Sequence, residues 1–191
     1  MSPKPGRERG SKANCGKLSQ NVGPFRPKVG MNNPTTLKRE TKTAAPRLNY
    51  ATVAPRVMEA MLALQAAADQ SGLDETLLNL VKLRASQING CAFCIEMHVR
   101  EAKAIGETDE RLSLLDAWRE VDIYTEREQA ALAWAERVTR LAGTHVSESD
   151  FAAARAAFSE KELAELALVI VAINGWNRLN VGFRMPPRFG E

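Results

Sequence analysis

The chain has 191 residues, of which 45% are hydrophobic and 26% are charged, so it can form a packed core and wholesale disorder is excluded. Its formal net charge of +3 is unevenly distributed, because residues 1–47 contain 11 Lys or Arg and 2 Asp or Glu, whereas the remainder contains 15 and 21. The part that folds is therefore predicted to be mildly acidic, which disfavours nucleic-acid binding by it.

The apolar runs and the cysteines indicate the cellular compartment in which the protein is expected to lie. The longest apolar run, 166–173, is far shorter than the roughly 18–20 residues that span a membrane, and the N-terminus lacks the apolar region of a secretory signal. The three cysteines are an odd number, and two of them lie in one CxxC, which disfavours a disulfide-stabilised secreted fold. We therefore expect a reducing, cytoplasmic location and no membrane partner.

The first 47 residues contain six of the nine prolines and five of the twelve glycines, without a helical or strand period. Such a segment buries too little apolar surface to offset its ordering entropy, so we predict a basic, disordered tail over 1–47, with Cys15 as a bystander thiol. Three interpretations stay open: an arm for an anionic surface or nucleic acid, a targeting leader, or an upstream start with Met31 or a later residue as the true beginning.

Residues 48–185 are predicted to form one helical domain, followed by a short tail over 186–191. Apolar spacings of three and four residues predict helices over 51–68 and 74–88, which end at Ser71-Gly72 and Asn89-Gly90. A third helix is predicted from Cys91 to Ala104, and a fourth from Thr108 or Asp109 to about Arg119. Capping-box spacing predicts three more helix starts, at Thr125, Ser147 and Ser159, with the last helix running to about Phe183.

No segment alternates convincingly between apolar and polar residues as a strand would. We therefore expect an all-α fold, a compact bundle of about six to seven helices with short connections.

The strongest chemical signal is the motif Cys91-Ala-Phe-Cys94-Ile-Glu-Met-His98. On a helix, spacings of three and four residues bring two thiols and one imidazole to a single face. The preceding Asn89-Gly90 places Cys91 in the first turn, where free backbone N–H groups and the helix dipole favour a thiolate. His98 supplies either a positive neighbour or a proton acceptor, so we predict an activated cysteine nucleophile.

Two thiols at this spacing can also close a disulfide. A thiolate that attacks a peroxide becomes a sulfenic acid, and the partner thiol then condenses with it and releases water. Cys94 is nearer to His98 in sequence, so we assign it as the attacking thiol. Cys91 is then the resolving thiol and the sulfur that an external reductant meets first.

Three other interpretations of the motif were weighed. A zinc site needs four ligands, and His145 is the sole histidine besides His98. A thioredoxin-type CxxC follows a strand in a βαβ pattern, which the sequence does not show. Both cysteines could instead be small buried hydrophobic residues. The redox interpretation is favoured because the histidine follows one helical turn after the CxxC.

Residues 80–98 read LVKLRASQINGCAFCIEMH, and this segment closely resembles the core motif of the AhpD-like alkylhydroperoxidases of the carboxymuconolactone decarboxylase superfamily. The likeness continues through 106–112, 117–120, 127–134, 144–146 and 172–178, so it spans about 48–185. It implies an all-α fold, a homo-oligomer such as a trimer or hexamer, and thiol-dependent peroxidase activity in antioxidant defence. Cys94 would be the peroxidatic and Cys91 the resolving cysteine.

The resemblance also implies partners. The substrate would be a hydroperoxide, and the electrons would come from a dithiol donor, a lipoyl-bearing or thioredoxin-like protein. The Cys91–Cys94 disulfide would be the redox group, with no separate cofactor and no metal.

Two departures from the family pattern concern proton transfer. The family has a glutamate twelve positions before the first cysteine, where this chain has Asn79, and a histidine between the cysteines, where this chain has Phe93. An amide cannot take up a proton near neutral pH. Glu75 and Glu96 are the carboxylates considered as substitutes.

We accordingly expect a weaker or differently tuned peroxidase, because general acid–base assistance is worth roughly 10²–10⁴-fold. The alternatives are a general disulfide oxidoreductase of the same family and a non-catalytic helical, oligomeric interaction protein. The lactone decarboxylases of the superfamily do not rely on a CxxC, so that activity is disfavoured.

Overall fold

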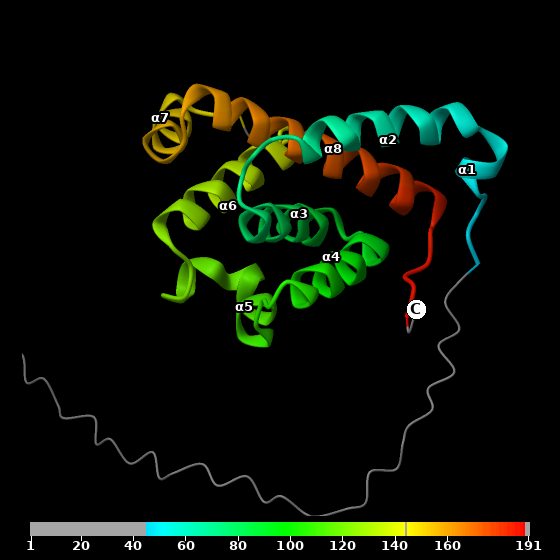
Figure 1. Ribbon diagram of the computed structural model, residues 1–191, viewed down its shortest axis with the longest axis horizontal. Coiled ribbons are helices and arrows are strands. Elements are labelled where there is room, and N and C mark those ends of the chain that lie inside the picture. The colour runs from blue at the N-terminus through cyan, green and yellow to red at the C-terminus, as the bar shows by residue number, and fades with distance from the viewer. Residues whose placement is uncertain (1–44, 144, 190–191) are drawn as a thin grey trace, which may run out of the picture. The chain divides into compact units, whose positions relative to one another are not determined.

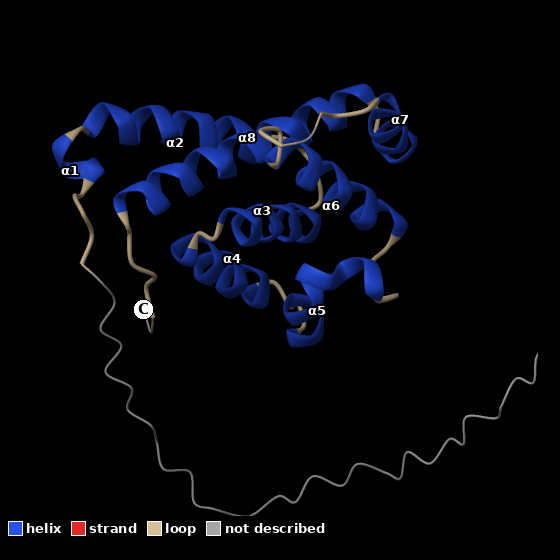
Figure 2. Cartoon of the chain, turned by 180° about the vertical axis from the view of Figure 1, so that it is seen from behind, coloured by secondary structure: helices blue, strands red, loops and turns tan. Residues whose placement is uncertain are grey.

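The computed structural model describes residues 45–143 and 145–189, and within these ranges every regular element is a helix (Figures 1 and 2). The elements are α1 (Tyr50–Val53), α2 (Pro55–Asp69), α3 (Glu75–Asn89), α4 (Ala92–Ala104), α5 (Asp109–Leu114), η1 (Leu115–Glu120, a 3₁₀ helix), α6 (Glu126–Thr139), α7 (Glu148–Ala157) and α8 (Glu160–Phe183). The predicted all-α fold is confirmed. The predicted tail over 1–47 lies, except for its last three residues, outside the described ranges.

Two predicted helices are each divided in the structure. The first, expected over 51–68, is broken between α1 and α2, because Pro55 restricts the residue before it and Ala54 adopts φ −142° and ψ 70°. Pro55 then occupies the first turn of α2, where its missing N–H costs nothing. The fourth is divided into α5 and η1 at Leu115, and η1 is itself kinked at Ala117, which has non-helical dihedral angles of −108° and 27°.

The three predicted capping boxes are present, at the starts of α6, α7 and α8. At the start of α8, the backbone N–H and hydroxyl of Ser159, together with Arg127, lower the pKa of Glu162 to about 2. These local hydrogen bonds explain why the helix starts could be read from sequence.

The core is built around α3, which packs against α4, α6 and α8 (Figures 1 and 2). The α3 side chains Leu80, Val81 and Leu83 are at most 1% exposed. Helix α2 lies along α8. Both helices of the CxxC region, α3 and α4, are thus held by central packing, which fixes the position of the turn between them.

Helix α8 is long and apolar enough to cross a membrane by length and composition alone. Its side chains Leu166, Val169 and Ile170 are nevertheless at most 1% exposed within the helical packing, and three asparagines lie buried along it. These features are those of the central helix of a packed domain.

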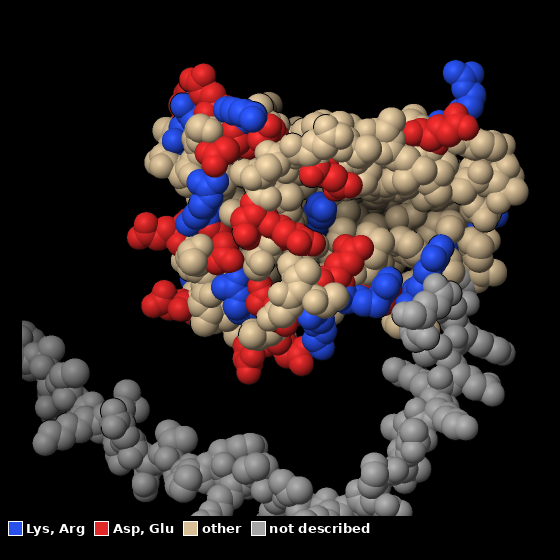
Figure 3. All heavy atoms as spheres, viewed as in Figure 1, with Lys and Arg blue, Asp and Glu red and all other residues tan. Residues whose placement is uncertain are grey.

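Charge is unevenly distributed over the surface. Lys, Arg, Asp and Glu side chains gather over α5, α6 and α7, whereas the surface over α1 and α2 is largely uncharged (Figure 3). Val53, Val57 and Leu62 are exposed there. This surface is a candidate contact area for another protein.

A buried ionic cluster joins α3, η1 and α6 around Glu136, which is 6% exposed. Its carboxylate accepts hydrogen bonds from Arg84 Nε at 2.7 Å, Arg119 at 2.8 Å and the Trp118 indole at 3.1 Å. Burial alone would raise the pKa of Glu136, but these donors outweigh it, and the pKa lies below its ordinary value.

We expect Glu136→Ala to lower the free energy of unfolding by about 3 kcal/mol, because Arg84 Nε and the Trp118 indole N–H are left buried without their acceptor, while Arg84 keeps its ion pair with Asp116. Since the folded-state pKa of Glu136 is depressed, its contribution to the free energy of unfolding is fully present above the ordinary glutamate pKa. This contribution is lost as the pH falls below that value. Urea unfolding at pH 7 and at pH 3–4 measures both effects. Glu126→Ala, on the exposed first turn of α6, is the control and should cost less than about 1 kcal/mol.

Candidate functional site

The turn between α3 and α4 places the two cysteines. Gly90 ends α3 in the left-handed conformation, with φ 64°, which glycine adopts without a steric penalty. The Cys91 backbone N–H then donates to the Ser86 carbonyl at 3.0 Å. This hydrogen bond completes a Schellman motif, which terminates α3.

Cys91, the predicted helix start, is the N-cap of α4, which begins one position later at Ala92, and the Cys91 Sγ accepts the Cys94 backbone N–H at 3.3 Å. The two sulfurs form a disulfide, with the Cα atoms 5.3 Å apart. Cys91 is 1% exposed and Cys94 is fully buried. The CxxC thus forms an oxidised pair inside the protein.

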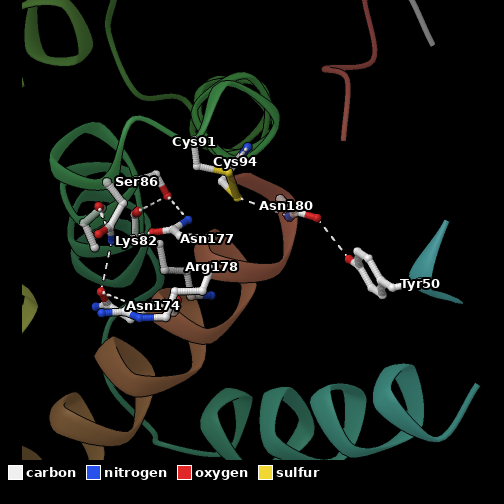
Figure 4. The surroundings of a disulfide bond; sticks show 11 residues. Tyr50, Lys82, Ser86, Cys91, Cys94, Asn174, Asn177, Arg178 and Asn180 are labelled. Carbon is white, nitrogen blue, oxygen red and sulfur yellow. Dashed lines mark hydrogen bonds between the residues drawn. A yellow bond between two sulfur atoms is a disulfide. The ribbon is translucent and has the colours of Figure 1, made fainter. Parts of the chain in front are cut away.

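Buried amides hold the end of α3 against α8 (Figure 4). Asn89 donates to the side-chain oxygens of Asn174 at 3.0 Å and Asn177 at 2.9 Å, and Asn177 donates to the Ser86 hydroxyl at 3.1 Å. The signal in the sequence is a set of asparagines beside the apolar run of α8. What they contact could not be read from it.

A second buried chain of hydrogen bonds reaches Cys94 itself. The Asn180 amide donates to Cys94 Sγ at 3.4 Å, and the Tyr50 hydroxyl donates to the Asn180 oxygen at 2.9 Å (Figure 4). Sequence reasoning missed both residues, because they lie 86 and 130 positions from their partners.

His98 lies one turn after Cys94 on α4 and is 4% exposed. Its Nδ1 is 2.9 Å from a carboxylate oxygen of Glu101, and its Nε2 has no hydrogen-bond partner among the described residues. The hydrogen bond to His98 is the main reason that the pKa of Glu101 lies below its ordinary value. With Nδ1–H donating to Glu101, a neutral His98 keeps a free acceptor at Nε2.

Cys94 and His98 line the same cavity, of about 1110 Å³, but no hydrogen bond joins them. The cavity is also lined by apolar residues of α2, α3, α4, α8 and the loop between α2 and α3, which include Met58, Leu62, Leu73, Leu78, Met97, Ile173 and Trp176. A molecule in this cavity would therefore lie beside both Cys94 and His98. Cys91 is not among the lining residues.

The carboxylate that contacts His98 is Glu101, which the sequence interpretation did not consider. Asn79 and Glu75 line the cavity, and Asn79 is buried. Glu96 instead pairs with Arg100 at 3.2 Å and borders a shallow groove on the outer side of α4. The signal available in the sequence was the three-residue spacing of His98 and Glu101 on a helix.

The described ranges contain no group of three or more His, Cys, Asp or Glu side chains arranged to hold a metal ion. The donor atoms near the disulfide are amides, one imidazole and one hydroxyl. Such groups orient and stabilise sulfur anions and move protons.

The sequence model of the carboxymuconolactone decarboxylase family matches residues 55–137. The uncharacterised protein YdfG of Bacillus subtilis is 38% identical over 135 residues, which cover 71% of this chain and 92% of YdfG. A crystal structure from Agrobacterium tumefaciens, of a protein of unknown function for which an AhpD antioxidant-defence role has been suggested, is 42% identical. It has a TM-score of 0.73 and covers 75% of this chain and 99% of its own.

The debrominase Bmp8 shares the fold, with a TM-score of 0.64 and 21% identity over 71% of this chain and 73% of its own. At that identity the likeness extends to the fold alone.

We expect neutral His98 to carry its proton on Nδ1, because Glu101 accepts that hydrogen bond. Ring ¹⁵N chemical shifts at about pH 8.5 distinguish the two tautomers, with His145 as the internal reference. Glu101→Ala should remove the preference for Nδ1–H. Glu96→Ala, on the same helix but paired with Arg100, should leave the His98 spectrum unchanged. An Nε2–H tautomer in the unmodified protein would contradict this assignment.

Proposed function

Because this chain belongs to the carboxymuconolactone decarboxylase family and carries a cysteine pair beside a histidine-lined cavity, we propose that it is a thiol peroxidase of the AhpD-like type that acts in antioxidant defence. The observation that carries the proposal is the Cys91–Cys94 disulfide, of which Cys94 lines a cavity together with His98. The same pair would serve as the redox group without a separate cofactor.

The proposed reaction has two steps on sulfur. The Cys94 thiolate attacks the outer oxygen of a hydroperoxide, the O–O bond breaks, and the alcohol leaves after taking up one proton, which gives a sulfenic acid. The Cys91 thiolate then attacks the Cys94 sulfur, and the oxygen leaves as water after a further protonation. The substrate gains two electrons, and the two thiols become the disulfide seen in the structure.

Proton transfer falls to His98 in this proposal. Its Nε2 is buried and has no partner in the described part of the chain, so an oxygen atom of a bound peroxide or water would supply the missing hydrogen bond. Glu101 would hold the ring and stabilise its charged form, which provides the carboxylate that Asn79 cannot. In this proposal Glu101, rather than Glu75 or Glu96, is the carboxylate that assists His98.

The burial of the disulfide limits which reductants can reach it. Both cysteines are at most 1% exposed, and Cys94, not Cys91, borders the cavity. A reductant entering through the cavity would meet Cys94 first, opposite to the order inferred from sequence. A slender dithiol, such as a lipoyl group on a flexible arm, fits this access better than the flat surface of a thioredoxin-like protein.

We also propose that the protein is a homo-oligomer and that it is located in the cytoplasm. The uncharged surface over α1 and α2, with Val53, Val57 and Leu62 exposed, supports a homo-oligomer, which the family resemblance puts at a trimer or hexamer. The reduced thiols that the reaction needs support a reducing, cytoplasmic location.

We expect Cys94→Ser to abolish turnover of cumene hydroperoxide with dihydrolipoamide as the electron donor, since the attacking sulfur is lost. In the absence of dihydrolipoamide or any other thiol donor, Cys91→Ser should consume about one equivalent of peroxide per chain and accumulate a sulfenic acid on Cys94, because the resolving thiol is missing. Peroxide consumption and dimedone labelling with mass spectrometry measure the two effects. Cys15→Ser, which removes the cysteine outside the motif, is the matched control and should keep full activity.

Two results would contradict the peroxidase. Full activity in Cys94→Ser would exclude the sulfur chemistry proposed. Thiols that remain unreacted after one equivalent of peroxide in the unmodified protein would favour the non-catalytic interaction protein, or, if dithiols still exchange with the pair, a general disulfide oxidoreductase.

The size and apolar lining of the cavity predict a preference for bulky organic hydroperoxides over hydrogen peroxide. Met97→Trp narrows the cavity, so we expect kcat/KM for cumene hydroperoxide to fall at least about tenfold while that for hydrogen peroxide changes less than about twofold. Ile105→Trp, at the exposed end of α4 and outside the cavity, is the control. Equal losses for both peroxides would contradict a cavity that selects by size.

A further inference from the structure

The hydrogen-bond chain from Tyr50 through Asn180 to Cys94 joins three helices at the reactive sulfur (Figure 4). Tyr50 is on α1, Asn180 is in the last turns of α8, and Cys94 is in the first turn of α4. Tyr50 and Asn180 are 6% and 5% exposed. The chain of donors ends on a sulfur, which accepts hydrogen bonds weakly as a disulfide and strongly as a thiolate.

We propose that Asn180 is a catalytic residue that stabilises the Cys94 thiolate with its amide N–H, and that Tyr50 is a positioning residue that keeps this N–H directed at the sulfur. This inference rests on Cys94 being the attacking thiol of the proposed function. It assigns to the two residues the hydrogen bond that stabilises the thiolate, which the CxxC and His98 alone do not provide.

The need for such a donor follows from burial. Cys94 is fully buried, and a buried anion is costly unless a donor compensates for the lost water. The backbone N–H of Cys94 itself is already used, because it donates to Cys91 Sγ. His98 forms no hydrogen bond to the sulfur. Asn180 is the side-chain donor that the structure places on Cys94.

Tyr50 fixes which end of the carboxamide faces the sulfur. Its hydroxyl donates to the Asn180 oxygen, and burial raises the pKa of Tyr50, so the hydroxyl stays protonated through the neutral range. Turning the amide would place its oxygen against the thiolate and its NH₂ against the hydroxyl. Because the Tyr50 hydroxyl donates to the Asn180 oxygen and the Asn180 N–H donates to the sulfur, the two hydrogen bonds also polarise each other in the same direction.

The backbone around both residues is held in place. Arg47 donates its backbone N–H to the Phe183 carbonyl and its guanidinium to the Gly182 carbonyl, both at 2.8 Å. The Tyr50 and Phe183 rings lie 5.6 Å apart. Met185 N–H donates to the Asn180 carbonyl at 2.9 Å. The start of the described chain is thereby tied to the end of α8, and Tyr50 reaches Asn180 as a consequence.

Other titratable groups face the same cavity, and they act on the sulfur independently of Tyr50. They come from α2, α3, α4 and the segment after α8, and they are Asp69, Glu75, Lys82, His98, Glu101 and Arg188. A test of the proposal must therefore change the hydrogen-bond chain and leave these groups in place. Removal of one hydroxyl or one amide does so.

The experiment measures the pH midpoint of Cys94 alkylation by iodoacetamide in the reduced full-length chain, resolved from Cys91 by tandem mass spectrometry. Asn180→Ala should raise the midpoint by about one pH unit or more, as expected for loss of a hydrogen bond to a charged group. Tyr50→Phe keeps the ring and should raise it by about half a unit. In the Asn180→Ala background, Tyr50→Phe should add no further shift.

Tyr124→Phe is the matched control, because Tyr124 is the other tyrosine of the chain and is also buried, with its hydroxyl bonded to the Arg111 carbonyl on α5. It should leave the Cys94 midpoint unchanged. Asn180→Asp, nearly equal in shape, places a second negative charge at the sulfur and should raise the midpoint more than Asn180→Ala does. Circular dichroism establishes that each variant is folded.

The proposal is overturned if folded Asn180→Asp and Tyr50→Phe proteins keep the midpoint of the unmodified chain, or if Tyr124→Phe shifts it as much as Tyr50→Phe. It is supported if the midpoints move as stated even when the unmodified protein reduces no hydroperoxide. In that event the peroxidase function fails and the assignment of Asn180 and Tyr50 stands.

Discussion

Three buried asparagines occur at intervals of three residues in the second half of α8, so their side chains form one polar stripe directed into the protein. Asn174 and Asn177 bind Asn89 at the end of α3, and Asn180 binds Cys94 in the first turn of α4. A buried amide without a partner costs about 1–3 kcal/mol. The stripe therefore admits one register of α8 against the α3–α4 turn, and that register determines where the sulfurs lie.

The site that results separates its tasks among elements. The α3–α4 turn supplies the cysteine pair, α4 supplies His98 with its own carboxylate Glu101, and α1 and α8 supply the hydrogen-bond chain to the sulfur. Cys94 and His98 do not bond to each other but share one cavity. An oxygen atom of a bound substrate would lie between Cys94 and His98. Reaction at the sulfur and proton transfer at the imidazole would therefore be coupled only when substrate is bound.

Much of the architecture was predictable because it depends on contacts close in sequence. The three capping boxes, the glycine that ends α3, and the Cys91–Cys94 and Cys94–His98 spacings at the start of α4 all involve residues within five positions of one another. The errors were local too. Pro55 divides the first predicted helix, and the change to a 3₁₀ helix at Leu115 left no pattern in the sequence.

The sequence alone determined that this chain is helical, and it predicted a candidate chemical centre at a CxxC with a histidine one turn later, because side-chain spacing on a helix follows from backbone geometry. The tertiary structure decided which groups serve that centre. It placed Asn180 on Cys94, Tyr50 on Asn180, and Cys94 rather than Cys91 at the cavity. Such partners are chosen by how α1, α3, α4 and α8 pack, and packing joins residues whose separation along the chain carries no signal.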